Sequence, residues 1–204
     1  MIKGTPELIA GRREEIINAC EQLYQTMSFK EIGNIVPFSR PTIYNYFQTR
    51  EEIFLALYER EYVRWNEDLT AILEEHEKLT AAELADRIAR SLTKREQLLK
   101  LLSMNNYDME ADSRPELLRS FKTAYGRSMQ LMGMLLRKFC TWMSDIEMQS
   151  VIYIFFPFMF GIYPYTAVTE KQRTAMQEAG VDYVYQSIYE ITRSCLIRLL
   201  GDPS

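Results

Sequence analysis

The chain has 204 residues, of which 47% are hydrophobic and 12% aromatic, and its formal net charge is −4. This apolar content is enough to fill a core, so the composition excludes a globally disordered chain. The acidic balance excludes a protein whose whole surface coats nucleic acid, but not one with a local footprint for it.

The cysteines and the histidine give no metal pattern. Cys20, Cys140 and Cys195 are widely spaced without a C-x-x-C pair, so we expect buried, reduced thiols. The single histidine, His76, lies among glutamates at an expected helix end and cannot complete a zinc set. We therefore expect no metal and no cofactor.

The chain is predicted to be helical almost throughout, since Gly and Pro are few and alternating strand patterns are absent. Its recurrent start signal is the capping box, a Ser or Thr followed three residues later by Glu or Gln. This pattern occurs at Thr49/Glu52, Thr80/Glu83, Ser113/Glu116, Ser144/Glu147 and Thr169/Gln172.

The first 48 residues predict three short helices. The first covers about residues 6–25 and the second about 28–35, and Pro37 then breaks the chain. Ser39 is expected to cap the third helix, with Pro41 in its first turn. Ile43 and Phe47 lie four residues apart and should face inward.

The third helix, residues 39–47, has the chemistry of a surface that contacts DNA. An arginine can bind guanine or phosphate, an asparagine can pair with adenine, and hydroxyl groups can bind phosphate oxygens. The segment has no acidic residue, and an arginine in the first turn of the next helix adds a phosphate contact. The expected DNA-binding residues are Ser39, Arg40, Pro41, Thr42, Tyr44, Asn45, Tyr46 and Arg50.

A purely structural interpretation of the same segment stays open. Tyr44 and Phe47 can be core aromatics, and Arg40 can be a solvated charge. Residues 1–64 are not basic as a whole, since eight Lys and Arg residues face nine acidic ones. One copy would bind DNA only modestly, which favours a dimer.

The rest of the chain predicts longer helices. A connecting helix is expected over 49–79, about 45 Å long at 1.5 Å per residue. Loop residues are expected between Asn105 and Asp112, and Pro157, Gly161 and Pro164 should break or kink one helix. The other expected helices cover 80–92, 94–104, 113–142, 144–165, 169–179 and 181–200. The apolar run 151–163 is too short to span a bilayer, and we read it as a buried core helix. No signal peptide precedes the first helix, so we expect a cytoplasmic protein.

Residues 12–60 resemble the DNA-binding domain of the TetR (tetracycline-repressor) family of bacterial transcription regulators. The resemblance rests on the segments Arg13–Ala19, Phe38–Phe47 and Gln48–Phe54, together with Ile32. One departure is a short connection, because only residues 25–31 separate Tyr24 from Ile32. The resemblance implies an all-α fold, with a helix-turn-helix domain over 1–48 and a larger effector-binding and dimerisation domain over 49–204.

The larger domain also has candidate residues for an effector and for dimerisation. Aromatic and methionine side chains are dense between residues 104 and 165 and suit an apolar or planar effector. The pocket candidates are Trp65, Tyr125, Met129, Trp142 and Phe158. The helices over 144–165 and 181–200 are rich in apolar residues that look exposed, and two such helices from each subunit could form a four-helix interface. The last helix has more apolar positions than one buried stripe needs, so Tyr185, Ile188, Thr192, Cys195 and Leu199 are candidates for this homodimer interface. Ordinary core packing and a fully buried last helix remain the alternatives.

The predicted function is a ligand-responsive, DNA-binding transcription regulator, a repressor that a small molecule releases from its operator. No nucleophile–base pair, Gly-rich phosphate loop or metal spacing is present, so we expect no enzyme. The competing interpretations are an all-helical enzyme and an all-helical ligand-binding scaffold without DNA binding.

Overall fold

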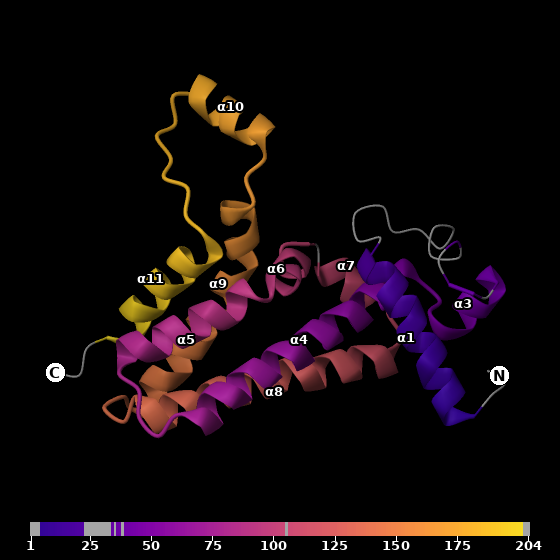
Figure 1. The fold of residues 1–204 in the computed structure, drawn as a ribbon, viewed down its shortest axis with the longest axis horizontal. Coiled ribbons are helices and arrows are strands. Elements are labelled where there is room, and N and C mark those ends of the chain that lie inside the picture. The colour runs from indigo at the N-terminus through magenta and orange to yellow at the C-terminus, as the bar shows by residue number, and fades with distance from the viewer. Residues whose placement is uncertain (1–4, 23–33, 35, 38, 105, 202–204) are drawn as a thin grey trace. The chain divides into compact units, whose positions relative to one another are not determined.

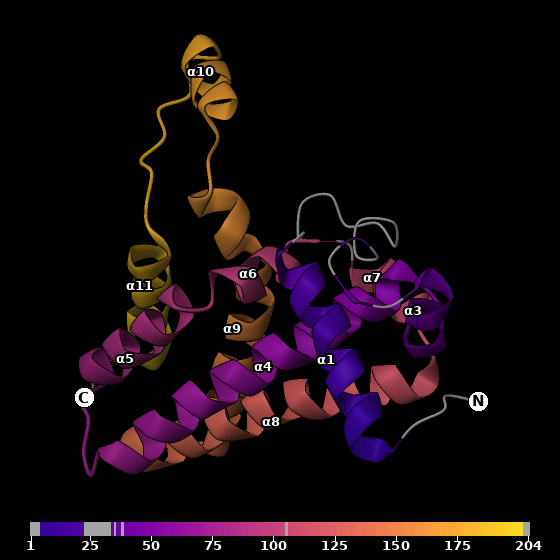
Figure 2. The same ribbon diagram turned by 45° about the vertical axis from the view of Figure 1, so that its right-hand side comes forward.

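The computed structural model describes residues 5–22, 34, 36–37, 39–104 and 106–201. All regular secondary structure in these ranges is α-helical (Figures 1 and 2). The helices are α1 (Pro6–Gln22), α3 (Arg40–Tyr46), α4 (Arg50–Glu75), α5 (Ala81–Thr93), α6 (Glu96–Leu102), α7 (Asn106–Ala111), α8 (Pro115–Phe139), α9 (Asp145–Thr166), α10 (Glu170–Glu178) and α11 (Ile188–Leu200). The expected helix over 28–35 and the short connection before it fall almost wholly outside the described residues.

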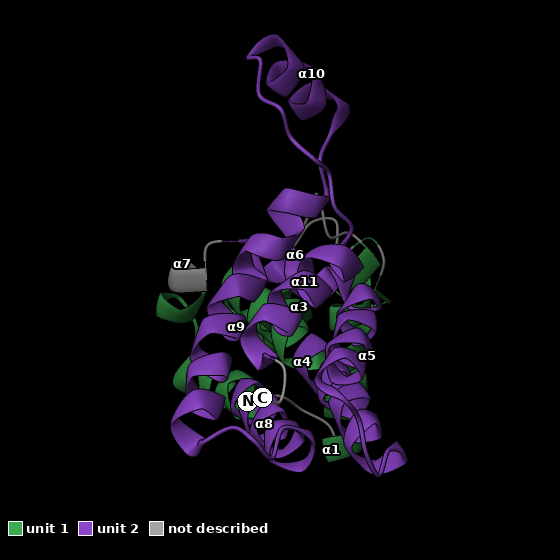
Figure 3. Ribbon diagram, turned by 90° about the vertical axis from the view of Figure 1, so that its left-hand side faces the viewer, with its two compact units in different colours: residues 1–60, 105–123 green, residues 61–104, 124–204 purple. Residues whose placement is uncertain are grey.

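The chain forms two compact units, and helices α4 and α8 contribute to both (Figure 3). Unit 1 contains residues 1–60 and 105–123, and unit 2 contains residues 61–104 and 124–204. This division differs from the expected boundary after residue 48, because the starts of α4 and α8 pack with the N-terminal helices. The functional boundary after residue 48 stays a prediction.

Unit 1 is held together by an apolar core and by ion pairs between α1 and α4. Ile16 and Cys20 of α1 are fully buried, as are Ile43 and Phe47 at the third predicted helix. Arg60 of α4 donates to carboxylates of α1 at Glu14 and Glu21, at 2.5 and 2.8 Å. It also donates to the Asn18 side chain at 2.8 Å.

Unit 2 is a helical layer in which α11 packs against α5 and α9, while α6 packs against α9. The buried faces are mainly Leu, Ile, Ala and Phe, as their helical spacing predicts. The Tyr189 hydroxyl of α11 donates to Asp86 of α5 at 2.5 Å, and the Arg90 guanidinium lies 5.1 Å from the Tyr189 ring. The pKa of Asp86 is held below its usual value by hydrogen bonds from Arg90 and Tyr189.

Two expectations about helix boundaries were wrong, and of the break or kink expected at Pro157, Gly161 and Pro164 the break does not occur. Residues 106–111 form helix α7 where a loop was expected, and residues 181–187 are not helical, so α11 begins at Ile188. Helix α9 continues through Pro157 and Pro164 without a break. Pro157 and Pro164 lie on the exposed side of α9.

The expected capping boxes at Thr80, Ser144 and Thr169 are confirmed, and Ser187/Glu190 forms a fourth that was not predicted. At α4 only half the pattern forms: the Thr49 hydroxyl accepts from the Glu52 amide, but the Glu52 carboxylate accepts from the amide of Gln48 instead. Ser113/Glu116 was a wrong expectation, because the Ser113 hydroxyl donates to the Met109 carbonyl at 2.6 Å.

The thiols are free, as expected. Cys20 and Cys140 are buried, and Cys195 is half-buried. Burial raises the pKa of Cys20 to about 12 and that of Cys140 to about 11, so both are uncharged at neutral pH.

The apolar run 151–163 was expected to form a buried core helix, but only one face of it is buried. By length and composition alone, the 22 residues of α9 are enough to cross a membrane. Only 33% of its most apolar window is buried. One face of α9 packs against α6 and α11, and the opposite face is exposed.

Candidate functional site

Helix α3 is short and its ends are set by local sequence. Ser39 occupies the N-cap with extended backbone (φ −68°, ψ 154°), and Pro41 lies in the first turn, both as expected. The Ser39 hydroxyl does not bond a helix amide but lies 3.0 Å from the Thr42 hydroxyl. At the other end, the Phe47 amide donates to the Ile43 carbonyl and closes the last turn.

The burial pattern of α3 separates a packed face from an outer face. Ile43 and Phe47 have no exposed surface, as predicted. Tyr44 is 50% exposed and Asn45 is also exposed, so both lie on a surface open to a partner. In the first turn, Pro41 is exposed and Thr42 is half-buried. The side chain of Arg40 is outside the described part of the chain.

Tyr46 corrects the expected outer face. It is only 6% exposed, and its hydroxyl is buried without a hydrogen-bond partner among the described residues. Tyr46 lies three residues after Ile43 in the sequence, on the same side of α3, so it joins the packed face. A phosphate contact through this hydroxyl is therefore not available in the described conformation.

The start of α4 places two polar groups next to α3. Arg50 is exposed, and its guanidinium carbon lies 5.0 Å from the centre of the Phe54 ring. The Thr49 hydroxyl donates to the Asp112 carbonyl at 3.2 Å. A cation stacked on an aromatic ring at a helix start is suited to binding a phosphate.

Several acidic groups of the N-terminal region form ion pairs with arginines of unit 1. Glu14 and Glu21 pair with Arg60, and Glu59 lies 3.6 Å from Arg13. Glu52 is 1% exposed and pairs with Arg114. These carboxylates are paired with arginines within unit 1, which reduces their repulsion of a polyanion at α3.

Two of the five predicted effector residues lie in one aromatic cluster of unit 2. The Tyr62 ring lies 6.4 Å from that of Trp65 and 5.5 Å from that of Tyr125. The Phe156 ring lies 5.9 Å from Trp65 and 5.6 Å from Tyr125. Tyr62 and Phe156 were missed by the sequence analysis, although Tyr62 lies three residues before Trp65 on the same face of α4.

Polar groups are buried beside these rings. The Trp65 indole donates to the Ser91 hydroxyl at 3.0 Å, and the Asn66 amide donates to the Ala124 carbonyl at 3.0 Å. The Asn66 carbonyl oxygen is buried and has no partner among the described residues. Burial raises the pKa of Tyr62, with a further contribution from Tyr125, so its hydroxyl stays protonated.

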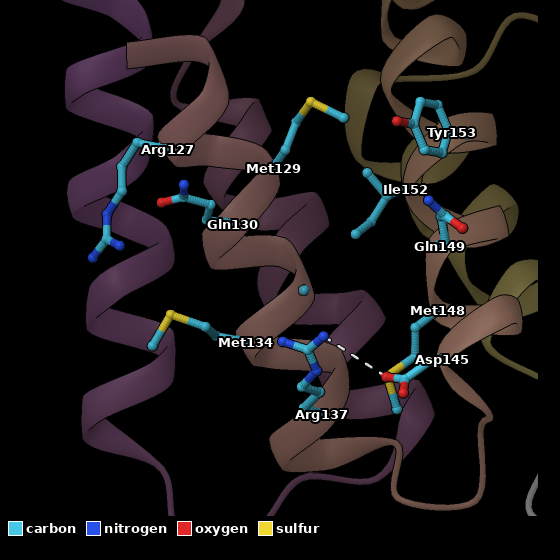
Figure 4. A pocket seen from close by; sticks show the side chains of 11 residues that line it. Arg127, Met129, Gln130, Met134, Arg137, Asp145, Met148, Gln149, Ile152 and Tyr153 are labelled. Atoms are coloured by element: carbon cyan, nitrogen blue, oxygen red, sulfur yellow. Dashed lines mark ion pairs between the residues drawn. The ribbon is translucent and has the colours of Figure 1, made fainter. Parts of the chain in front are cut away.

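Met129 is placed elsewhere, in a groove between α8 and α9 with a volume of about 650 Å³. In Figure 4, Met129 and Ile152 extend from α8 and α9 toward the space between the helices. Arg137 and Asp145 form an ion pair of 3.7 Å at one end of the groove.

The last two predicted pocket residues join neither the aromatic cluster nor the groove. Phe158 stacks on Phe155 at 6.2 Å. Trp142 is 38% exposed, and its indole nitrogen lies 3.4 Å from the Leu200 carbonyl.

The predicted dimer residues divide into two groups. Ile188, Cys195 and Leu199 are half-buried on α11. Thr192 is wholly buried within the chain, so its expected exposure to a partner subunit was wrong. Tyr185 precedes α11 and lies in a cluster with Tyr183 and Arg173, at 5.0 and 4.2 Å.

A second surface lies along α9, which corresponds to the helix expected over 144–165 and predicted to take part in the dimer interface. We call it the α9 outer face. Its apolar residues are exposed and recur at helical spacing. They are Ile146 (77% exposed), Tyr153 (60%), Ile154 (52%) and Phe160 (40%).

A family model decides the relationship of this chain to known proteins. Residues 59–196 match the model described as "Tetracyclin repressor-like, C-terminal domain". The chain belongs to the TetR family. This match covers most of the chain and, in particular, the part where the sequence motifs had given only a likeness in architecture.

Solved structures agree with this assignment at the level of the fold. FadR from Bacillus subtilis in complex with stearoyl-CoA has a TM-score of 0.58 at 14% identity, over 94% of this chain and 99% of that one. A TetR transcriptional regulator from Rhodococcus sp. RHA1 has a TM-score of 0.56 at 13% identity, covering 96% and 98%. FadR from Bacillus halodurans has a TM-score of 0.56 at 13% identity, covering 96% and 99%. No curated protein matches the chain.

Membership of the TetR family confirms the all-α fold and the class of function predicted from the sequence. The protein is a ligand-responsive transcription regulator and not an enzyme. TetR regulators are soluble proteins that bind operator DNA and small-molecule effectors and form dimers.

Proposed function

We propose that this TetR protein is a cytoplasmic homodimeric repressor, released from its operator by a small apolar or aromatic effector. Each subunit inserts α3 into a major groove, and the two copies of α3 lie about one DNA turn apart, or about 34–36 Å. The observation that carries the proposal is the two-sided burial of α3, which packs Ile43 and Phe47 and exposes Tyr44 and Asn45.

The DNA-binding part is tested with a duplex selected by the protein itself from a randomised pool. Tyr44→Ala and Asn45→Ala should each weaken binding to this duplex by about tenfold, since a good base contact contributes about 1–3 kcal/mol. Tyr165→Ala is the matched control, because Tyr165 is similarly exposed (57%) but lies in unit 2. If no duplex shifts selectively at low salt, the protein is a helical scaffold without DNA binding.

The proposed effector site is the aromatic cluster of Tyr62, Trp65, Tyr125 and Phe156. Aromatic faces bind apolar and planar ligands, and the unpartnered oxygen of Asn66 supplies an acceptor for a ligand hydroxyl or amine. FadR from Bacillus subtilis, of similar fold, was crystallised with stearoyl-CoA, so long acyl thioesters belong in a test panel with small planar aromatics.

Trp65 provides a direct reporter for this site. The chain has two tryptophans, so Trp142→Phe leaves Trp65 as the only one. We expect an effector from the panel to change Trp65 fluorescence and to release the selected duplex over the same concentration range, since the two equilibria are linked. Asn66→Leu removes the proposed acceptor beside the aromatic cluster and should abolish this response. Met134→Ala, in the groove between α8 and α9, is the control. If Met134→Ala abolishes the response while Asn66→Leu does not, the effector site lies in the groove.

A further inference from the structure

Arg114, the residue before α8, binds the two segments that hold the recognition helix. Its Nε and Nη2 atoms donate to the two carboxylate oxygens of Glu52, at 2.6 and 3.0 Å. Its backbone amide donates to the same carboxylate at 3.2 Å. Nη2 also donates to the backbone carbonyl of Tyr46 at 2.8 Å.

These contacts lie at both ends of residues 47–49, the link between α3 and α4. Tyr46 is the last residue of α3, and the last carbonyls of a helix have no partner within it. A cation there also opposes the partial negative charge of the helix end. Glu52, in the first turn of α4, accepts from the Gln48 amide of the link at 2.6 Å. One guanidinium–carboxylate pair therefore fixes where α3 ends and where α4 begins.

We propose that Arg114 is a positioning residue for operator binding, which orients the recognition helix through the Tyr46 carbonyl and Glu52 without touching DNA. The inference rests on the proposed DNA-binding function. Arg114 lies 68 residues from Tyr46 in the sequence, outside the helix-turn-helix segment. It also directly precedes α8, whose later residue Tyr125 belongs to the aromatic cluster. A displacement of α8 on effector binding would act on α3 through this residue.

If Arg114 only stabilised the packing of α4 on α8, its loss would loosen these two helices as much as α3. The packing of α4 on α8 within unit 1 has other contacts: the Tyr58 and Phe121 rings meet edge to face at 5.3 Å, and the Ser120 hydroxyl donates to Glu59 at 2.6 Å. These contacts remain when Arg114 is replaced. Loss of the guanidinium should therefore loosen α3 more than it loosens α4 or α8.

The experiment compares Arg114→Gln with Arg119→Gln in the full-length protein. Arg119 is exposed on the same helix and unit, so its replacement removes the same charge without affecting these contacts. Arg114→Lys keeps the positive charge beside Glu52 but cannot form the forked contact to two groups. It tests the proposal if the glutamine variant does not fold. The readouts are hydrogen exchange of the α3 amides and binding to the duplex selected by the wild-type protein.

We expect Arg114→Gln to speed exchange at the last α3 amides by about tenfold or more, while α4 and α8 amides stay protected. Its affinity for the selected duplex should fall by about tenfold, and its affinity for a random duplex should fall less. Arg114→Lys should show the same pattern to a smaller degree. Equal exchange at α3 in Arg114→Gln and Arg119→Gln would overturn the inference, whatever the DNA result. A protein in which α3 loosens but no duplex is bound at all would contradict the proposed function.

Discussion

The hydrogen-bond partner of the Glu52 carboxylate differs from the one that the sequence predicted. The sequence places it at the third position of a capping box, where its carboxylate should bond Thr49. The folded chain instead buries it to 1% exposure against Arg114. Burial alone would raise the pKa of Glu52, but hydrogen bonds from Arg114 and from the Gln48 amide outweigh it. The pKa therefore lies below its ordinary value of 4.5.

Glu52 should make stability depend on pH in a defined direction. A carboxylate with a lowered folded-state pKa stabilises the fold above about pH 4.5, and this contribution is lost as the pH falls through the folded-state pKa. We expect Glu52→Gln to lower the free energy of unfolding by about 1–3 kcal/mol at pH 7, because it breaks charge-assisted hydrogen bonds. The difference from wild type should shrink as the pH falls below about 4.5 and through the lowered folded-state pKa.

Urea unfolding at several pH values measures this, with Glu51→Gln as the control for removing one negative charge at the same helix start. A destabilisation by Glu52→Gln that stays constant from pH 7 to pH 3 would show that the carboxylate is not the stabilising group.

At the scale of helices, the local sequence predicts where a helix starts better than where it ends or which helix it packs against. The complete capping box formed where the Ser or Thr hydroxyl had no competing partner outside the first turn of its own helix. It failed at Ser113, where the Met109 carbonyl at the end of α7 lay within reach of the hydroxyl. It was overlooked at Ser187 because Tyr183 and Tyr185 extended the apolar pattern N-terminally beyond the true helix start.

Two of these boxes should differ in their effect on stability although their geometry is the same. Ser187→Ala should lower the free energy of unfolding by about 1 kcal/mol, since α11 packs against α5 and α9. Thr169→Ala removes an equivalent cap from α10, which has no buried residue and stands apart from the other helices (Figures 1 and 2). It should therefore leave the global unfolding transition unchanged.

Thermal or urea unfolding of both variants checks this pair, and hydrogen exchange in α10 shows whether Thr169→Ala frays that helix alone. Equal destabilisation by the two substitutions would mean that α10 folds cooperatively with the other helices.

At the scale of the whole molecule, the α9 outer face is the surface that most needs a partner. Exposed apolar side chains at helical spacing mark an interaction site in a soluble protein. The face includes Ile146, Tyr153, Ile154 and Phe160, and it lies on one of the two helices that the sequence predicted for the dimer interface. A twofold interface uses the same patch in both subunits, so apolar residues here would meet their own copies.

Ile154→Glu should therefore raise the dimer dissociation constant by at least about tenfold, because a carboxylate would be buried without a partner at the interface. Light scattering at decreasing concentration measures the mass, and affinity for the selected duplex should fall in parallel because two copies of α3 act together. Val63→Glu on α4, also exposed (44%), is the matched control. Should Ile154→Glu keep the wild-type mass at every concentration, the interface lies elsewhere.

The sequence by itself determined the helical class, most helix starts, the inward positions of Ile43 and Phe47, and the family resemblance at residues 12–60. These properties depend on contacts three or four residues apart, which periodicity and caps report directly.

Tertiary structure decided the rest. It buried Tyr46, brought Tyr62 and Phe156 to Trp65 and Tyr125, and joined Arg114 to Glu52. The physical reason is sequence separation. The carboxylate of Glu52 and the guanidinium of Arg114 are 62 residues apart, and only the packing of α8 against α4 makes them neighbours. A helical pattern shows which face of each helix is buried, but not which side chain of another helix it meets.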